Sequence, residues 1–338
     1  MASGKVARRT VVSDVAALLD SPELAALIAE LDALRWTGRK GYGVRALLGA
    51  CLVKSLFGLP TWTITAALIA EHAGLQDALG ATPSVWAMYR FAVKLRDNRP
   101  AVEGCLDALA ESLRAEHPDF GKDVAIDASD LPAFANGQRY VRNGGPERER
   151  FSDPDASWGH RSAVSTRKGG GFYGYKIDLA VCTRTGLPLA WQTRTARHHE
   201  SLFVAHLLDA VHARGFQPET VAMDKGYDVE RIHAECETRG VHPVVPMKGT
   251  KGKQVVMPIS NGTRNFPHIA RHTERFRKLY AGRAGVEREF GRLKHDYGLA
   301  PLRVRGKERV AVHADLCILA RLSLALIRAR SVPQAVAA

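Results

Sequence analysis

The sequence predicts an α/β protein in which a mixed sheet flanked by helices follows an all-helical domain. Residues 11–117 show helical periodicity throughout, whereas the chain beyond them alternates short β-branched or apolar runs with helical segments. A chain of 338 residues with 46% hydrophobic residues can fill such a core. We therefore predict a helical domain over 1–117, an α/β domain over 118–330 and a tail over 331–338.

The first domain consists of several short helices separated by turn signals. GLP at 58–60 and ATPS at 81–84 contain the Gly and Pro residues that end helices, as in helix-turn-helix modules. DNA binding agrees with this organisation, although the spacing alone does not prove it. We expect the tryptophans of this domain to be core aromatics rather than base-stacking residues: Trp36, Trp62 and Trp86.

The second domain is predicted as strand, hairpin or meander, helix, strand, helix, strand and closing helix. The segments are, in order, DVAIDASD, YGYKIDLAVCTRTGLPLAWQTRTA, a helix over about 201–214, TVAMDKGYD, a helix over about 229–239, HPVVPMK and YAGRAGVEREFGRLK at 280–294. A polar, Gly-rich stretch after the first strand and a basic linker over 249–279 interrupt this order.

The charge balance indicates a polyanionic partner. Forty-eight Lys and Arg against 35 Asp and Glu give +13, which favours nucleic acid or an anionic membrane. The apolar stretches over 44–59 and 316–327 contain Arg or Lys before reaching the roughly 20 apolar residues of a membrane span. No start resembling a signal peptide precedes them. We therefore expect nucleic acid as the partner and no membrane.

The cysteines and histidines predict neither disulfides nor zinc. Five scattered cysteines without a Cys-x-x-Cys pair are typical of buried thiols in a reducing compartment, so we expect a cytoplasmic protein. Among 13 histidines, His233 with Cys236 and the pair His198–His199 suggest a metal site. No four-ligand zinc spacing can be assembled from them.

Two carboxylates end two similar strands. VAID ends on Asp127 and VAMD ends on Asp224, and open α/β sheets place their sites at the carboxyl ends of strands. Either aspartate alone could merely cap the turn that follows. Four other aspartates compete, the first two as expected capping residues and the last two as minor candidates in the polar loop: Asp123, Asp130, Asp153 and Asp155.

A polar stripe lies along the predicted helix at 280–294. At roughly 100° per residue, four residues fall within an arc of about 60°: Tyr280, Arg283, Glu287 and Lys294. Glu289 points the opposite way, and Val286, Phe290 and Leu293 form an ordinary apolar face. The alternative is a solvated face with an i,i+4 salt bridge.

Three carboxylates together suggest metal chemistry. Asp127, Asp224 and Glu287 offer hard oxygen ligands suited to Mg²⁺ or Mn²⁺ bound together with a phosphate. Two such ions about 3.5–4 Å apart can activate an attacking oxygen and stabilise a leaving one in an in-line displacement at phosphorus.

The order Asp127, Asp224, Glu287, with the last inside Tyr-x2-Arg-x3-Glu-x6-Lys, resembles the DDE transposases of bacterial insertion sequences, in the group marked by that Tyr-Arg-Glu-Lys signature. The resemblance extends to DPDASWGHRS, GYKIDLAV, MDKGYD and RHTERFRKLYAGRAGVEREFGRLK. GYGVRALLGACLVKSLFGLP looks like the N-terminal domain often joined to these catalytic cores.

The resemblance implies a ribonuclease-H-like core in which the three carboxylates bind two Mg²⁺ or Mn²⁺ ions. It implies that Tyr280, Arg283 and Lys294 contact phosphates of the element's terminal DNA. Lys176 in GYK and Lys225 beside the second Asp are further candidate phosphate contacts, and each could equally be solvated.

The chain departs from members of the family that insert a β-rich domain, with a base-trapping Trp, between the second Asp and the Glu. Asp224 and Glu287 are 63 positions apart, and no Trp lies between them. The chain thus resembles the insertion-free branch. A hairpin intermediate is in doubt, because base flipping requires an acceptor pocket that the sequence does not identify.

The expected function is that of an insertion-sequence transposase, which binds terminal inverted repeats and catalyses metal-dependent DNA cleavage and strand transfer. Its partners would be double-stranded DNA, as element ends and as target, and a second copy in a homodimer, because two ends must be joined. We expect it at the bacterial nucleoid. Two alternatives stay open: a silent DNA-binding descendant, which the intact triad opposes, and a nuclease of the same fold without strand transfer.

Overall fold

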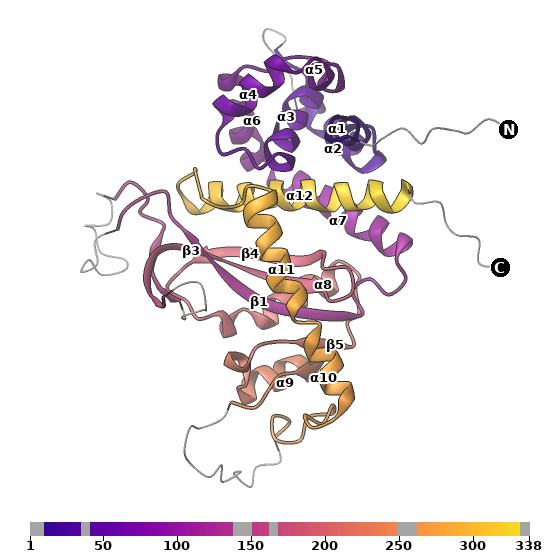
Figure 1. Ribbon diagram of the computed structural model, residues 1–338, viewed down its shortest axis with the longest axis vertical. Helices are drawn as coiled ribbons and strands as arrows, with labels where there is room; N and C mark the ends of the chain where they lie inside the picture. Colours follow the sequence, from indigo (N-terminus) through magenta and orange to yellow (C-terminus); the bar gives the residue numbers. More distant parts are fainter. Residues whose placement is uncertain (1–9, 35–40, 138–150, 162–167, 249–261, 332–338) are drawn as a thin grey trace, which may run out of the picture. The chain divides into compact units, whose positions relative to one another are not determined.

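The computed structural model describes residues 10–34, 41–137, 151–161, 168–248 and 262–331 (Figure 1). The chain forms two compact units, which are described separately. The first contains Met1–Glu116, Leu293–Leu299 and Val312–Ala338, and the second contains His117–Arg292 and Ala300–Ala311.

The first unit is helical, as predicted. Its N-terminal part contains α1 (Val11–Leu19), α2 (Pro22–Ala33), α3 (Val44–Leu56), α4 (Trp62–Glu71), α5 (Ala73–Leu79), α6 (Val85–Asp97) and α7 (Arg99–Glu116). Ser or Thr side chains accept a backbone hydrogen bond at the start of four of these helices, and so satisfy donors that the helix leaves free: Thr10, Ser21, Thr61 and Ser84.

The C-terminal helix α12 (Lys307–Ser331) joins this unit from Val312 onward. The Arg99 Nε lies 2.8 Å from the buried Oδ2 of Asp315, and the Arg330 Nη2 lies 2.8 Å from the buried Oε1 of Glu23. By length and composition alone α12 could span a membrane, whereas the Arg and Lys residues of this region predicted that it could not. However, 78% of its most apolar stretch is buried within the protein, as in a core helix.

The tryptophans of this unit do not share one environment. Trp62 is buried, as predicted, with the Lys54 Nζ 5.5 Å from its ring centroid. Trp86 is 73% exposed, so the prediction of a core role is wrong for this residue. It lies on α6 one turn before Tyr89, and the two rings are 6.1 Å apart on the solvent face. Trp36 lies outside the described residues.

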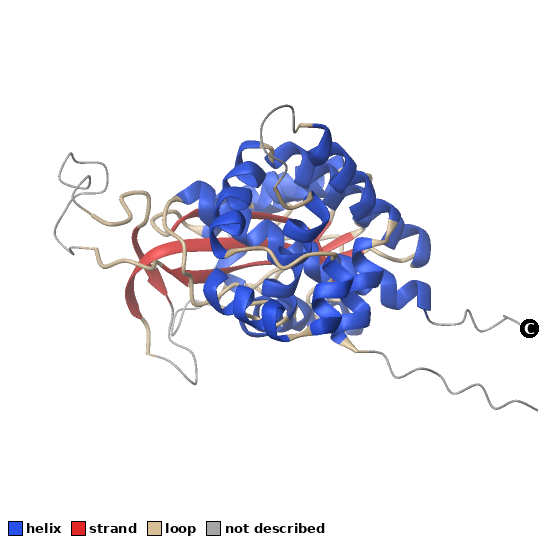
Figure 2. Cartoon of the chain, turned by 90° about the horizontal axis from the view of Figure 1, so that it is seen from above, coloured by secondary structure: helices blue, strands red, loops and turns tan. Residues whose placement is uncertain are grey.

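The second unit contains the predicted mixed sheet, which is curled (Figures 1 and 2). The strands are β1 (Asp123–Pro132), β2 (Ser157–Arg161), β3 (Gly170–Cys182), β4 (Pro188–Thr195), β5 (Thr220–Ala222) and β6 (His242–Val244). Their order is β2-β3-β1-β5-β6, with β4 also pairing with β3. The pairs of β3 with β1, β2 and β4 are antiparallel, whereas β5 is parallel to both β1 and β6.

Helices and short turns connect these strands or follow the last of them. They are η2 (Glu200–Leu202), α8 (Val204–Ala213), η3 (Lys225–Tyr227), α9 (Glu230–Thr238), α10 (Glu274–Ala281) and α11 (Ala284–Gly291). The helices predicted near 201–214 and 229–239 are confirmed as α8 and α9. Helix α8 packs against β3 and β4, and α11 packs against β1 and β3.

The segment predicted as one helix over 280–294 is divided, so that prediction is wrong in detail. Helix α10 ends before Gly282, α11 begins after Arg283, and a π-helix (Arg292–Asp296) follows. A Cβ on Gly282 would lie 3.0 Å from the Thr183 Cβ in the loop after β3. Glycine therefore lets the chain approach that loop where the helix breaks.

All five cysteines are free and buried, which confirms the prediction of buried thiols. Burial raises the pKa of the Cys51, Cys105 and Cys236 thiols to about 12.

Candidate active site

Arg283 joins two of the three predicted carboxylates. Its Nη1 lies 3.4 Å from the Asp127 Oδ2 on β1, and its Nη2 lies 2.7 Å from the Glu287 Oε1 on α11. The i,i+4 salt bridge that sequence spacing allowed is therefore present, and it also reaches the sheet. Packing of α11 against β1 is what places Glu287 near Asp127.

Asp127 lies within β1, because the strand continues to Pro132. The prediction that Asp127 ends its strand is therefore wrong. Its pKa is raised to about 7 because burial disfavours the charged carboxylate. The Ala128 N–H, which donates to Asp127 at 2.8 Å, and the Arg283 charge oppose this shift. The charges of Asp224 and Glu200 add to it. The charge of the predicted ligand Asp224 and that of a fourth carboxylate, Glu200, therefore both act on Asp127.

Asp224 follows β5 and caps the short helix η3. Its Oδ1 accepts a hydrogen bond from the Gly226 N–H. The capping role that the sequence left open is therefore real. It does not exclude a second role, because a carboxylate has further lone pairs and the charge of Asp224 acts on Asp127.

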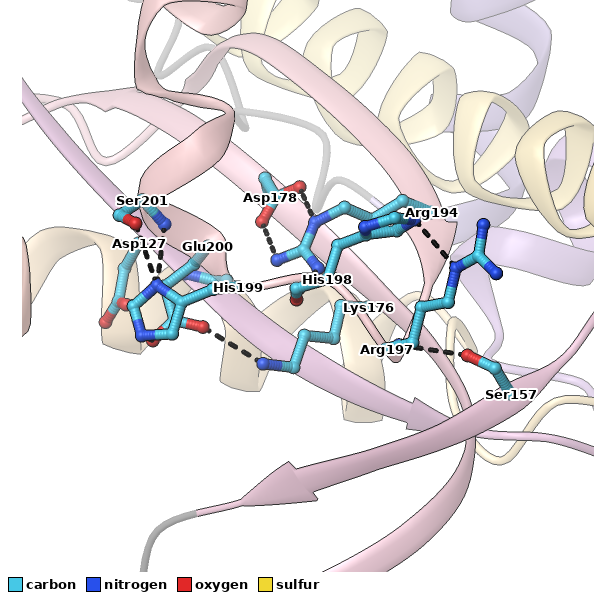
Figure 3. Close-up of polar contacts among 11 residues, drawn as sticks. Asp127, Ser157, Lys176, Asp178, Arg194, Arg197, His198, His199, Glu200 and Ser201 are labelled. Atoms are coloured by element: carbon cyan, nitrogen blue, oxygen red, sulfur yellow. Dashed lines mark hydrogen bonds and ion pairs between the residues drawn. The ribbon is translucent and has the colours of Figure 1, made fainter. Parts of the chain in front are cut away.

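Glu200 is an acidic residue that sequence reasoning missed. It begins η2, just after β4, and its Oε2 lies 3.0 Å from the Lys176 Nζ (Figure 3). Lys176 is therefore not a solvated lysine, and its contact with phosphate stays a prediction. The signal in the sequence is the position of Glu200 after a strand, in RHHE at 197–200, where its carboxylate resembles those of Asp127 and Asp224.

The donor set fits a divalent cation. Among the described residues no three His, Cys, Asp or Glu side chains already form a metal-binding group. The Arg283 guanidinium supplies positive charge between Asp127 and Glu287. Carboxylate oxygens are the ligands that Mg²⁺ and Mn²⁺ prefer.

Comparison with known proteins identifies the family. The model of the transposase DDE domain matches residues 118–323, more than half of the chain. The chain belongs to the DDE transposase family. The mixed sheet is the ribonuclease-H-like fold of these transposases, as predicted. The family points to DNA as a partner and usually uses divalent metal ions. No curated protein matches the chain.

A buried ion pair supports the turn that presents Glu200 in this transposase. The Arg194 Nε lies 2.5 Å from the Asp178 Oδ2, and its Nη2 lies 2.7 Å from Oδ1 (Figure 3). The Arg194 Nη1 donates to the His198 carbonyl at 2.5 Å, and its Cζ lies 4.5 Å from the centroid of the Phe203 ring. Arg194 thereby fixes residues on both sides of Glu200.

Tyr227 is buried beside these acids. Burial raises its pKa well above the usual value, and the charges of four carboxylates contribute: Asp127, Glu200, Asp178 and Asp224. The phenol is therefore neutral at physiological pH. A neutral tyrosine among acids adds no further negative charge to the candidate site.

The remaining predicted DNA contacts occupy different environments. Tyr280 stacks on Phe276 with ring centroids 6.0 Å apart and packs against the core that Phe276 shares with Ala222. The Arg283 Cζ lies 5.8 Å from the Tyr280 ring, so Tyr280 also supports Arg283. Lys225 is exposed beside Asp224.

Two further residues of the predicted helix 280–294 are Lys294 and Glu289. Lys294 lies in the π-helix and belongs to the first unit. Glu289 is fully buried, and its Oε2 lies 3.2 Å from the Arg292 Nη1, away from the Arg283 pair.

The four competing aspartates all have hydrogen-bond or ion-pair partners. The Asp123 Oδ1 accepts from the Thr220 hydroxyl at 2.5 Å, and the Asp130 Oδ2 lies 3.2 Å from the Arg161 Nη1. Neither of these contacts is the turn capping that was predicted. Asp153 and Asp155 accept backbone hydrogen bonds at 306 and 307.

Proposed function

We propose that the protein is an insertion-sequence transposase of the insertion-free Tyr-Arg-Glu-Lys group. It binds the terminal inverted repeats of its element, cleaves the DNA ends and transfers them to a target. The observation that carries this proposal is the Arg283 bridge between Asp127 and Glu287 in a chain of the DDE transposase family. Residues 118–330 would be catalytic and residues 1–117 would contribute DNA binding, in a homodimer at the bacterial nucleoid in the cytoplasm.

Asp127, Asp224 and Glu287 would hold Mg²⁺ or Mn²⁺, two ions per site. When bound, such ions activate the attacking oxygen and stabilise the leaving oxygen of an in-line displacement. A nearby cation favours the charged form of Asp127, whose pKa lies near 7 without it. The carboxylate would then give up its remaining proton to solvent.

Arg283 connects this site to the DNA substrate. Without DNA its guanidinium neutralises two carboxylates. A phosphodiester offers the same charge and bidentate geometry as a carboxylate, so the scissile phosphate can replace these partners. Lys225 is exposed next to Asp224 and would contact phosphates from that side, and Lys294 would add a contact from the π-helix.

The test is an end-joining assay with purified protein, labelled DNA that carries the element's ends, a plasmid target and Mg²⁺ or Mn²⁺. Cut ends that join the target with the wild type, and not with Asp224→Asn, would support a transposase. Asp224→Asn removes the charge and keeps the shape, so DNA binding should persist. Cutting without joining would indicate a nuclease instead. Binding without any metal-dependent product would indicate a silent descendant.

A further inference from the structure

A pair of stacked arginines lies at one end of the sheet. Phe134, two residues beyond β1, is 40% exposed, and two guanidinium groups lie on its ring. The Arg303 Cζ is 5.2 Å and the Arg305 Cζ is 4.9 Å from the ring centroid. The Arg305 Nε also donates to the Phe134 carbonyl at 2.7 Å. The segment with both arginines is thereby attached to the end of β1.

Two aspartates hold this segment in place. The Gly306 N–H donates to the Asp153 Oδ1 at 3.2 Å, and the Lys307 N–H donates to the Asp155 Oδ2 at 2.9 Å. Asp153 is fully buried, and its Oδ1 also accepts from the Tyr175 hydroxyl at 2.6 Å. These aspartates were minor metal-ligand candidates in the sequence. Their contacts instead anchor a basic segment, so its arginines are ordered before any ligand arrives.

The arrangement suits phosphate recognition. A guanidinium that lies over an aromatic ring gains a cation–π contact and keeps N–H groups available for a bidentate acceptor. In the part of the chain that the structure describes, no carboxylate pairs with Arg303 or Arg305, and both are exposed. Their charges are therefore not neutralised within this part. Phosphodiesters are the acceptors that best match such a pair.

We propose that Arg303 and Arg305, presented on Phe134, bind the phosphodiester backbone of duplex DNA that extends from the active site. This inference rests on the proposed transposase function and identifies one surface by which the catalytic unit holds its substrate. Element-end DNA and target DNA share the phosphate chemistry, so we expect the contact with both, and the experiment below tests both kinds of duplex.

Strand β1 relates this surface to the candidate active site. Phe134 follows Asp127 by seven residues, which span at most about 23 Å at roughly 3.3 Å per residue. B-DNA rises about 3.4 Å per base pair, so for DNA that runs along β1 the contacted phosphate would lie within about seven base pairs of the cut.

The first experiment measures the salt dependence of DNA binding by the full-length chain. The variant is Arg303→Gln, and the matched control is Arg184→Gln. Arg184 is exposed and pairs with Asp119. It follows the end of β3 that pairs with the start of β1, at the opposite end of the strand from Phe134. Each variant removes one charge, and thermal melting verifies that both fold.

Arg303→Gln should weaken binding to an element-end duplex and to an unrelated duplex by the same factor. It should lower the slope of log K against log salt by about one phosphate contact, while Arg184→Gln keeps the wild-type slope. An unchanged slope for Arg303→Gln would overturn the inference and leave the transposase proposal intact. A loss of affinity confined to the element-end duplex would also overturn the inference, because it would mean that Arg303 contacts bases and not the backbone. A wild type that binds neither duplex would end both proposals.

A second experiment locates the contact. Single methylphosphonate linkages, which remove the charge of one phosphate, are placed from three to ten base pairs from the cut. One linkage within about seven base pairs of the cut should weaken wild-type binding but not weaken Arg303→Gln further, because both changes remove the same interaction. Additive losses at every position would mean that Arg303 contacts none of these phosphates.

Discussion

At the scale of single residues, one arginine organises the candidate site. Arg283 lies at the N-terminus of α11, reaches Asp127 and Glu287, and stacks near Tyr280. The sequence placed three of these four residues on one stripe because their spacing is local. It could not show that Arg283 binds the carboxylates themselves, since that depends on how closely α11 packs on β1.

The raised pKa of Asp127 predicts a pH-dependent stability. Its folded-state pKa is about 7, above the ordinary 3.8, so between these values the folded protein binds more protons than the unfolded chain. Wild-type stability should therefore fall relative to Asp127→Asn as pH rises from about 4 to 7, by at most about 1.4 kcal/mol per pH unit. Urea unfolding in EDTA at several pH values measures the difference. A constant gap between the two proteins over this range would contradict the assigned burial.

Glu289 shows why helical phase alone gives a poor control. The sequence suggests that Glu289→Ala leaves cleavage unaffected because the residue points away from the stripe. The structure shows a fully buried carboxylate bound to Arg292. We expect Glu289→Ala to cost about 1–3 kcal/mol of folding stability and Glu289→Gln to cost less. Cleavage per folded molecule should match the wild type for both variants. A specific loss of cleavage in well-folded Glu289→Gln would place Glu289 in the reaction.

At the scale of secondary-structure elements, the sequence predicted most of the sheet and its flanking helices. Apolar runs such as VAID and VAMD mark β1 and the region of β5 because their periodicity is local. The break between α10 and α11 and the position of Glu200 were not predicted. The first depends on the contact of Gly282 with Thr183, and the second depends on the Lys176 and Arg194 contacts that form only when β3 and β4 pair.

A buried aspartate connects α9 to two arginines of the basic linker. Both Asp228 oxygens are used: Oδ1 lies 3.2 Å from the His233 Nε2 and from the Arg271 Nη2, and Oδ2 lies 2.8 Å from the Arg264 Nη2. The Lys248 N–H also donates to Oδ2 at 2.8 Å. This one carboxylate therefore joins three segments around β6.

Removing that carboxylate should be costly. Asp228→Ala removes the carboxylate that pairs with two buried or half-buried arginines, and we expect a loss of about 3–5 kcal/mol in the free energy of unfolding. Asp209→Ala is the control, since Asp209 forms a two-bond pair with Arg239 at a 57% exposed site and should cost less than about 1 kcal/mol. Urea unfolding measures both. Similar losses for the two variants would show that the Asp228 cluster adds no stability of its own.

At the scale of the whole molecule, each compact unit combines segments that are far apart in the sequence. The sequence suggests a helical domain that ends at 117, because the composition changes there. The helical unit also takes Leu293–Leu299 and Val312–Ala338 from the other end of the chain. No local pattern could reveal this, since α12 is apolar over much of its length and such a helix can pack against many partners.

This organisation predicts how fragments behave. A fragment of residues 1–117 lacks α12, so Arg99 loses Asp315 and Glu23 loses Arg330. The apolar surface that α12 covers would face water, at a cost of about 25 cal/mol per Å².

We expect this fragment to be partly unfolded or aggregated by circular dichroism and NMR. Co-expression with a fragment of residues 293–338 should restore a cooperative thermal transition. A fragment of residues 1–117 that melts cooperatively alone would show that the helical domain folds without α12, and that the boundary at 117 is also a folding boundary.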